Sequence, residues 1–136
     1  MPIEYKINLP LDLEAFIGVY RASSLGERRP VAEPQRMQRM LDEADLTVSA
    51  WDGARLVGLA RSLTDWAYCC YLADLTVADS HQRLGIGKEL IRQTQAALEP
   101  GAMLVLLAAP AAADYYPRIG MEKHPSAWIL RPGEKI

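Results

Sequence analysis

The chain has 136 residues, which is enough for one domain with a hydrophobic core. Half of its residues are hydrophobic and 24% are charged, the usual mixture of a soluble globular protein. The formal net charge of −2 excludes the strongly basic surface that nucleic-acid binding needs, and no apolar run is long enough to span a bilayer. We therefore expect a single domain over residues 1–136 with no nucleic-acid or membrane partner.

The N-terminal part predicts a short strand followed by two helices. Residues 4–9 are expected to form the strand. Apolar residues at helical spacing from Leu13 predict the first helix, with Asp12 as its N-cap. A polar loop over residues 23–30 follows, and a second amphipathic helix is expected to begin near Pro34, since proline suits a first helical turn.

The middle of the chain has the period of β-strands. Residues 46–51 and 55–62 predict two strands. The Asp52-Gly53 dipeptide between them favours the positive-φ turn of a tight hairpin. Residues 68–77 are rich in aromatic and β-branched side chains and predict a longer third strand.

The C-terminal part predicts alternating helices and strands. Apolar residues at helical spacing over residues 87–98 predict a helix. The uniformly apolar segment 103–108 predicts a strand that is covered on both faces. Residues 111–119 predict a short helix that Pro117 must kink or end early, and residues 127–131 predict a final strand.

The predicted order is β-α-α-β-β-β-α-β-α-β. A hairpin that leads into a strand–helix–strand unit indicates an α/β fold of mixed α+β character. We expect a central mixed, mostly antiparallel sheet with helices on both sides.

The only two cysteines, Cys69 and Cys70, are adjacent in the chain. Neighbouring residues of a strand point to opposite faces, so these two are not expected to form an ordinary disulfide. Free thiols without an N-terminal signal segment predict a reducing, cytoplasmic location.

The most informative segment lies where the third central strand gives way to a helix. Two glycines at positions 85 and 87 lead directly into that helix. Amides at a helix start have no intrahelical acceptor and the helix dipole adds positive charge, so the segment predicts a bound phosphate or diphosphate. A dinucleotide site would have a third glycine where Leu90 stands, and a P-loop would have Ser or Thr where Glu89 stands. Both of these alternatives are therefore disfavoured.

This segment, Gln82-Arg83-Leu84-Gly85-Ile86-Gly87, resembles the Gln/Arg-x-x-Gly-x-Gly/Ala signature of the GNAT superfamily of acetyl-CoA-dependent N-acetyltransferases. The hairpin over residues 51–60 is similar to a frequent hairpin of that family. The run Tyr115-Tyr116-Pro117-Arg118-Ile119-Gly120-Met121 resembles its Phe-Tyr-x-x-x-Gly-Phe segment. The three segments occur in the family's order and together cover roughly residues 46–121.

The resemblance implies a GNAT-like fold and an enzyme that moves an acetyl group from acetyl-CoA to a primary amine of a small molecule. It implies direct attack of the amine in a ternary complex, with acetyl-CoA as co-substrate and no metal. A non-catalytic CoA-binding regulatory or sensor module is the alternative. Homodimers are common in the family, and the apolar segment 127–130 is a candidate contact.

The resemblance also implies residue roles. The main chain of Leu75 and Val77 is expected to pair with the pantetheine arm, and the Val77 amide to polarise the acetyl carbonyl. Tyr116 matches the family's general acid, which returns a proton to the CoA thiolate. The diphosphate is expected to bind the backbone of Gln82, Arg83, Leu84, Gly85, Ile86, Gly87 and Lys88.

Two questions stay open at this point. Asp74 is the only acid in the strand 68–77, so it is either the base that deprotonates the amine or a hydrogen-bonded structural aspartate. Arg21, Arg28 and Arg29 either bind a carboxylate or phosphate of the acceptor or are solvated. His81 has a suitable pKa for base work, but its place beside the glycine turn predicts a surface imidazole.

Overall fold

The computed structural model describes residues 2–136 and contains one five-stranded sheet with the strand order β1-β2-β3-β4-β5. The strands are β1 (Ile3–Ile7), β2 (Leu46–Asp52), β3 (Arg55–Thr64), β4 (Cys69–Val77) and β5 (Met103–Val105). The first four pair antiparallel in succession, and β5 joins β4 in parallel. The prediction of a mixed, mostly antiparallel sheet is confirmed.

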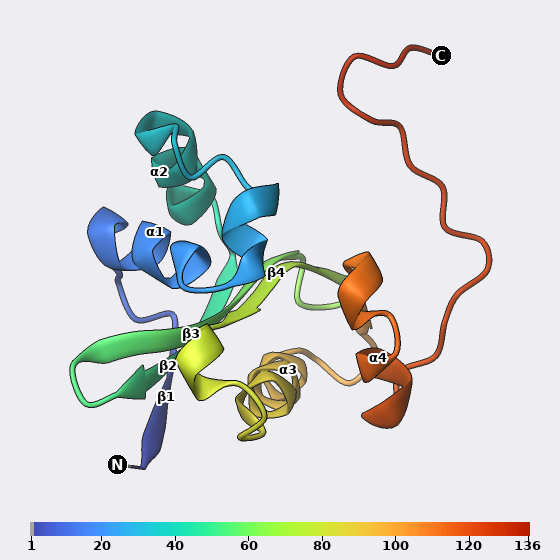
Figure 1. Cartoon of the computed structure of the whole chain (residues 1–136). Helices are drawn as coiled ribbons and strands as arrows, with labels where there is room; N and C mark the ends of the chain where they lie inside the picture. The colour runs from blue at the N-terminus through green and yellow to red at the C-terminus, as the bar shows by residue number, and fades with distance from the viewer. Residues whose placement is uncertain (1) are drawn as a thin grey trace.

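Helices cover both faces of this sheet (Figure 1). The helices α1 (Leu13–Arg21) and α2 (Pro34–Asp42) lie on one face, and α3 (Ile86–Ala96) lies on the other. As predicted, the Asp12 side chain caps α1 by accepting from an amide of its first turn, and Pro34 begins α2. The expected polar loop contains the short 3-10 helix η1 (Ser24–Arg28) between them.

The sheet separates two hydrophobic clusters. On the α3 side, buried residues of β2, β3 and β4 pack against Ile86 and Leu90 of α3. On the other side, Phe16, Val19 and Tyr20 of α1 pack against β3 and α2. In the part of the chain described, no helix is long and apolar enough to cross a membrane.

A β-bulge in β4 changes which side chains face each cluster. Arg61 of β3 pairs with Asp74 and the next residue pairs with Leu72, so Ala73 is an additional residue of β4. Before the bulge, Leu72 packs in the α3-side cluster; after it, Asp74 contacts α1, and Leu75 joins the α3 side instead. The bulge therefore places a carboxylate on the face of the sheet that α1 covers.

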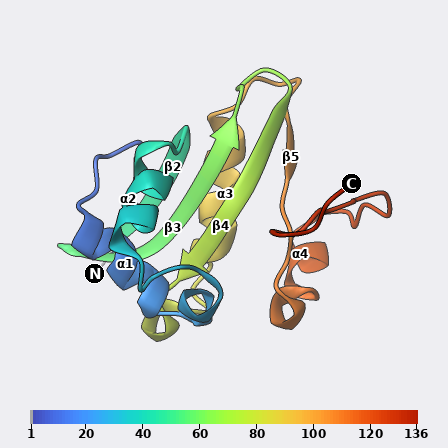
Figure 2. The same ribbon diagram turned by 90° about the horizontal axis from the view of Figure 1, so that it is seen from above.

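The strand β5 is shorter than the predicted segment 103–108. Its pairing with β4 stops at Val105, and Met103 and Val105 are 59% and 44% exposed, so the expected cover on both faces is wrong. The physical reason is that β5 lies at the edge of the sheet, and no described helix covers the face on which Met103 and Val105 lie. Figure 2 shows β5 running beside β4 at one end and leaving it toward α4 (Tyr115–Arg118).

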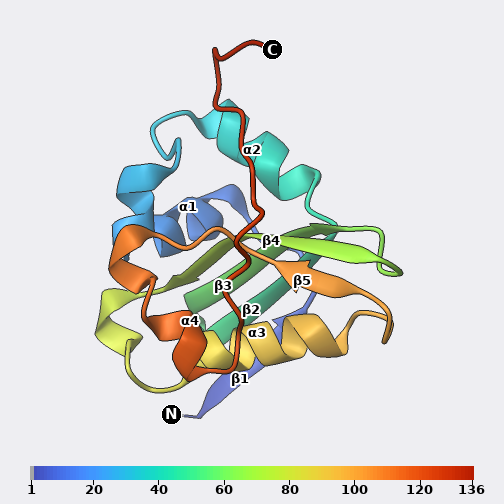
Figure 3. The ribbon, with the colours of Figure 1, turned by 90° about the vertical axis from the view of Figure 1, so that its right-hand side faces the viewer.

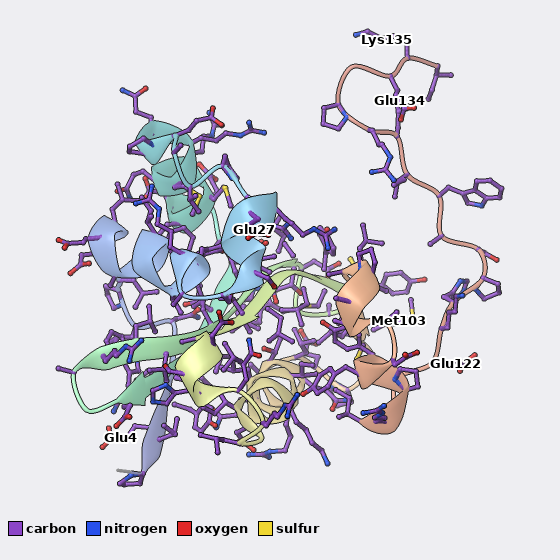
Figure 4. The ribbon with its side chains drawn as sticks, in the orientation of Figure 1. Glu4, Glu27, Met103, Glu122, Glu134 and Lys135 are labelled. Atoms are coloured by element: carbon purple, nitrogen blue, oxygen red, sulfur yellow. The ribbon has the colours of Figure 1, made fainter. Side chains whose placement is uncertain are left out.

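The predicted final strand over residues 127–131 is absent, and this prediction is wrong. Residues 122–136 form an extended tail that leaves the body after α4, with Glu134 and Lys135 at its far end (Figure 4). The tail has a short apolar run at residues 127–130, but a strand also needs a neighbour to pair with. No backbone hydrogen bond joins this tail to the sheet, and Trp128 is 92% exposed.

Candidate functional site

A cleft of about 530 Å³ opens where β4 and β5 separate. The second half of β4 forms one wall, and the chain after β5 forms the opposite wall with Leu106 and Leu107. The glycine turn before α3, the helix η1 and the tyrosines of α4 complete its lining. Figure 3 faces the side of the molecule on which β5 and α4 lie.

The glycine turn has the backbone shape of an anion site. Gly85 and Arg83 have φ values of 82° and 65°, in the left-handed region, and α3 begins immediately afterwards at Ile86. No side chain caps this helix, so the amides of its first turn are left without an intrahelical acceptor. Amides left free in this way are suited to the oxygens of an anion such as a diphosphate.

The structure brings most of the predicted CoA contacts to this one cleft. Leu84 and Lys88 are exposed and do not line it. The remaining predicted residues do line it, namely Leu75, Val77, Gln82, Arg83, Gly85, Ile86 and Gly87.

The edge of β4 that faces the cleft has free backbone groups. The amide of Ala78 donates to the carbonyl of Val57 in β3, at 2.8 Å. Because strand amides alternate in direction, those of Val77 and Leu75 point away from β3, toward the cleft. On the same side, the Gln82 side-chain amide donates to the Val77 carbonyl at 3.2 Å. An extended ligand could therefore add to β4 as a strand does.

Tyr115 and Tyr116 of α4 line the cleft together with the glycine turn at the start of α3. Their rings meet edge to face, with centroids 5.3 Å apart, and both side chains are half-buried. A Cβ built on Gly87 would lie 3.1 Å from the Tyr115 hydroxyl, so Tyr115 reaches the diphosphate end of the cleft. Tyr116 lines the same cleft, and burial raises the pKa of its phenol, with Tyr115 adding to the effect.

Pro117 does not displace these tyrosines from the cleft. It lies in the first turn of α4, where its missing N–H would have had no intrahelical partner. The predicted helix 111–119 is divided into the 3-10 helix η3 (Pro110–Ala112) and α4. Gly120, with φ 96°, follows α4 in the left-handed region, which suits a helix end.

Asp74 is enclosed rather than open to the cleft. Its side chain is fully buried and accepts hydrogen bonds from the Tyr20 hydroxyl at 2.6 Å, Arg61 Nε at 2.6 Å and Arg29 Nε at 2.5 Å. Burial alone would raise the pKa of this carboxyl, but Arg61, Tyr20 and Arg29 outweigh burial and hold the pKa below its ordinary value. Asp74 does not line the cleft, so the geometry favours the structural interpretation.

The partners of Asp74 include residues that the sequence reasoning missed. In the sequence, Tyr20 fits the apolar spacing of the first helix, and no motif contains Arg61. A signal for Arg61 was present, because a charged residue inside an otherwise apolar strand needs an opposite charge when it is buried. Burial and the neighbouring Asp74 also raise the pKa of Tyr20, so its hydroxyl stays protonated and continues to donate.

Ser23 and Thr76 form a second link between η1 and β4. Their hydroxyl oxygens lie 2.5 Å apart, and both residues line the cleft. Ser23 also caps η1 by accepting from the amide of Leu25 at 3.2 Å. Together with Arg29, this pair fixes η1 over the middle of β4.

His81 is not the surface imidazole that its position predicts. Its side chain is only 14% exposed, and Nε2 lies 2.8 Å from an Asp52 carboxylate oxygen. Nδ1 lies 2.7 Å from the Ser80 hydroxyl. The imidazole therefore joins the β2–β3 hairpin to the glycine turn. Between residues 2 and 136, no group of three or more His, Cys, Asp or Glu side chains is placed to hold a metal ion.

Comparison with known proteins gives one family. A family model described as "Acetyltransferase (GNAT) domain" matches residues 20–129. No curated protein matches the chain. Among solved structures, a GNAT-family acetyltransferase from Streptococcus pneumoniae TIGR4 is similar, with a TM-score of 0.74 and 23% identity over 96% of this chain and 99% of the other.

Two further structures have the same fold. A putative acetyltransferase from Deinococcus radiodurans R1 has a TM-score of 0.77 and 23% identity, covering 96% of this chain and 88% of that one. An aminoglycoside acetyltransferase from an uncultured soil metagenomic sample, in complex with sisomicin, has a TM-score of 0.70 and 21% identity, covering 95% of both chains. Since the family model spans most of the sequence, the chain belongs to the GNAT acetyltransferase family and is an acyltransferase.

Proposed function

We propose that this protein transfers the acetyl group of acetyl-CoA to a primary amine of a small molecule. The observation that carries this proposal is the cleft itself. It joins an uncapped, glycine-led helix start, a strand edge with free amides and a half-buried tyrosine. These three features match a diphosphate, a pantetheine arm and a thiolate leaving group in the order in which CoA carries them.

The chain's own groups would divide the work as follows. The amides at the start of α3 bind the diphosphate, and the Leu75 and Val77 main chain holds the pantetheine arm against β4. The Val77 amide donates to the acetyl carbonyl oxygen as negative charge develops there. The amine nitrogen forms the new bond to the acetyl carbon as the C–S bond breaks, and the Tyr116 hydroxyl gives its proton to the departing sulfur.

In the described part of the chain, the cleft is lined by no carboxylate that could take the proton the amine loses. We propose that Asp74 is a positioning residue rather than the base, because its oxygens are already held by two arginines and a tyrosine. A buried carboxylate with a lowered pKa is also a poor proton acceptor. The amine would then lose its proton to solvent at the open side of the cleft.

Thiol release tests the proposal. The protein is mixed with acetyl-CoA and a panel of primary amines, and free CoA thiol is followed with a thiol reagent, with amine-free and protein-free controls. Turnover that depends on an amine is expected. Tight CoA binding without thiol release across a broad panel would favour the sensor module, and no CoA binding would contradict both functions.

Gly87→Ala is expected to weaken CoA binding about tenfold, which corresponds to about 1.4 kcal/mol. The added methyl group would point at the Tyr115 hydroxyl, 3.1 Å away, in the part of the cleft where the main chain must approach the diphosphate. Isothermal titration with CoA measures the change. Gly18→Ala is the matched control, because a Cβ there meets nothing within 4 Å. Equal CoA affinity in both variants would contradict the placement of the diphosphate.

We also propose that the protein acts in the cytoplasm as a single domain. Cys69 and Cys70 are both free thiols, and Cys69 is exposed, which suits a reducing compartment. The homodimer stays a prediction. The exposed apolar residues of the tail, Trp128, Ile129 and Leu130, are available for such a contact.

A further inference from the structure

The charges that line the cleft are all basic. Within the part of the chain that the structure describes, no Asp or Glu side chain lines it. Arg28, Arg29 and Arg83 do, together with His81. Glu27, the residue just before Arg28 in the chain, is acidic but does not line the cleft (Figure 4). The imbalance is unusual in a chain whose formal net charge is −2.

These basic residues fall into two groups at different places along β4. Arg83 belongs to the glycine turn beyond Val77. Arg28 and Arg29 of the η1 region form the other group, near the middle of β4, where the Arg29 guanidinium donates to the Ala73 carbonyl at 3.0 Å. Val77 lies four positions after Ala73 in the strand, which is about 13 Å. The phosphates of CoA at the glycine turn therefore account for Arg83 but not for the arginines of η1.

The positive charge at η1 is only partly neutralised. Asp74 is shared between Arg29 and Arg61, so these three groups carry a net charge of +1. Arg28 is exposed, and its side chain makes no ion pair with any residue from 2 to 136. Arg29 also donates to the Arg28 carbonyl at 2.9 Å, which fixes the backbone from which the Arg28 side chain extends.

We infer that the amine acceptor carries a carboxylate, and that Arg28 binds this group at the η1 end of the cleft. A guanidinium offers two parallel N–H donors to a carboxylate, and the neighbouring +1 group strengthens the attraction. This inference rests on the proposed function and names its substrate class: an amino acid or a related amine acid. Arg28 is a specificity-determining residue in this assignment.

The same charges disfavour polycationic acceptors. The similar structure from the soil metagenomic sample is in complex with sisomicin, an aminoglycoside. An acceptor with several ammonium groups would bring like charges to a cleft that offers them no carboxylate. Like charges at short distances repel even in bulk water, and they repel more strongly where the site excludes water. We therefore do not expect aminoglycosides to be acceptors of this protein, although it shares its fold with that acetyltransferase.

Matched acceptors test the inference. Thiol release is measured with α-amino acids and with the corresponding amino acid amides, which keep the amine and replace the carboxylate by a neutral group. The wild-type chain is expected to prefer the acid, with the higher kcat/KM. In Arg28→Glu the acid-to-amide ratio of kcat/KM is expected to fall about 10- to 100-fold, the scale of one hydrogen-bonded charge pair. Amino phosphonates show whether phosphonate replaces carboxylate.

Arg39→Glu is the control for net charge. Arg39 is an exposed residue of α2 that does not line the cleft, so the acid-to-amide ratio should stay at the wild-type value. An unchanged ratio in Arg28→Glu would overturn the inference. So would a wild-type protein whose best acceptor is an aminoglycoside or a polyamine. In either case the proposed acetyl transfer would stand, because turnover would still be seen.

A binding measurement separates this inference from turnover. Isothermal titration of the CoA-bound protein compares N-acetyl amino acids with their amides, which are the two kinds of product. Tighter binding of the acids, lost in Arg28→Glu and kept in Arg39→Glu, supports the inference even if no rate is measured. Equal binding of acids and amides overturns it. Failure of CoA itself to bind would instead count against the proposed function.

Discussion

Replacing Tyr116 by phenylalanine is expected to lower kcat for thiol release by at least about 100-fold, while CoA affinity stays unchanged. The phenol is half-buried in the cleft, and burial raises its pKa, so it is protonated throughout the neutral range. The loss should fall on kcat because the hydroxyl acts only when charge develops on the sulfur. Steady-state kinetics and CoA titration of the same preparation separate the two effects.

Tyr115→Phe is the matched control, since it removes the same hydroxyl from the adjacent residue. Its hydroxyl lies near Gly87, at the diphosphate end, so its loss should leave kcat within about threefold of the wild type. If Tyr115→Phe loses the rate and Tyr116→Phe keeps it, the general acid is Tyr115. Equal, small effects in both variants would mean that the leaving group takes its proton from water.

Asp74→Ala is expected to lower the free energy of unfolding by about 3–5 kcal/mol. The substitution leaves two arginines, Arg61 and Arg29, facing each other without their shared carboxylate, and Arg61 is buried. It also removes the acceptor of the Tyr20 hydroxyl. Chemical denaturation measures the free energy of unfolding. A slope of this free energy against denaturant concentration that equals the wild-type slope shows that unfolding remains two-state.

Two variants make the effect of Asp74→Ala specific. Tyr20→Phe removes one hydrogen bond to the carboxylate and should cost about 2 kcal/mol. Asp42→Ala removes an exposed carboxylate that accepts a hydrogen bond from Gln38 of the same helix. It should change the free energy of unfolding by less than about 0.5 kcal/mol. If Asp74→Ala costs no more than Asp42→Ala, the buried network does not hold η1 and α1 to β4.

Acid should weaken the same network. The pKa of Asp74 is lower in the folded chain than its ordinary value, so the stability it contributes is fully present above the unfolded pKa of about 3.9. That contribution is lost as the pH falls through the folded pKa. Unfolding free energies measured from pH 6 down to pH 2 should fall more for the wild type than for Asp74→Asn. Parallel curves would contradict the lowered pKa.

The local parts of this fold could be predicted from the sequence because local rules decide them. Asp12 caps α1, and a glycine leads into α3 at position 85. The predicted tight hairpin forms one residue later than the Asp52-Gly53 dipeptide indicates: Asp52 pairs with Arg55, and the turn residues are Gly53, with φ 60°, and Ala54. Each of these depends on a few consecutive residues whose backbone preferences agree. The glycine turn could therefore be assigned to a phosphate ligand before its surroundings were known.

The remaining features depend on residues far apart in the chain. Nothing near Asp74 in the sequence indicates that Tyr20, 54 residues away, donates to it. The strand predicted for residues 127–131 is wrong because a short apolar run shows only that a segment could pair, while pairing requires a neighbouring strand. Likewise β5 ends at Val105, although the apolar run continues, because the chain leaves β4 there toward α4.

The additional residue in β4 has a consequence for insertions and deletions. Alternation along a strand has a phase, and Ala73 shifts that phase by one residue between Leu72 and Asp74. Without the bulge, Leu72 and Asp74 would share a face, because residues two apart in a regular strand do. A deletion of Ala73 removes the bulge itself, so Asp74 would follow Leu72 directly, stay opposite Arg61 on the α1 face, and leave Leu75 on the α3 face. The strand can thus lose one residue between Leu72 and Asp74 without moving the buried charge, a tolerance that substitutions at single positions would not reveal.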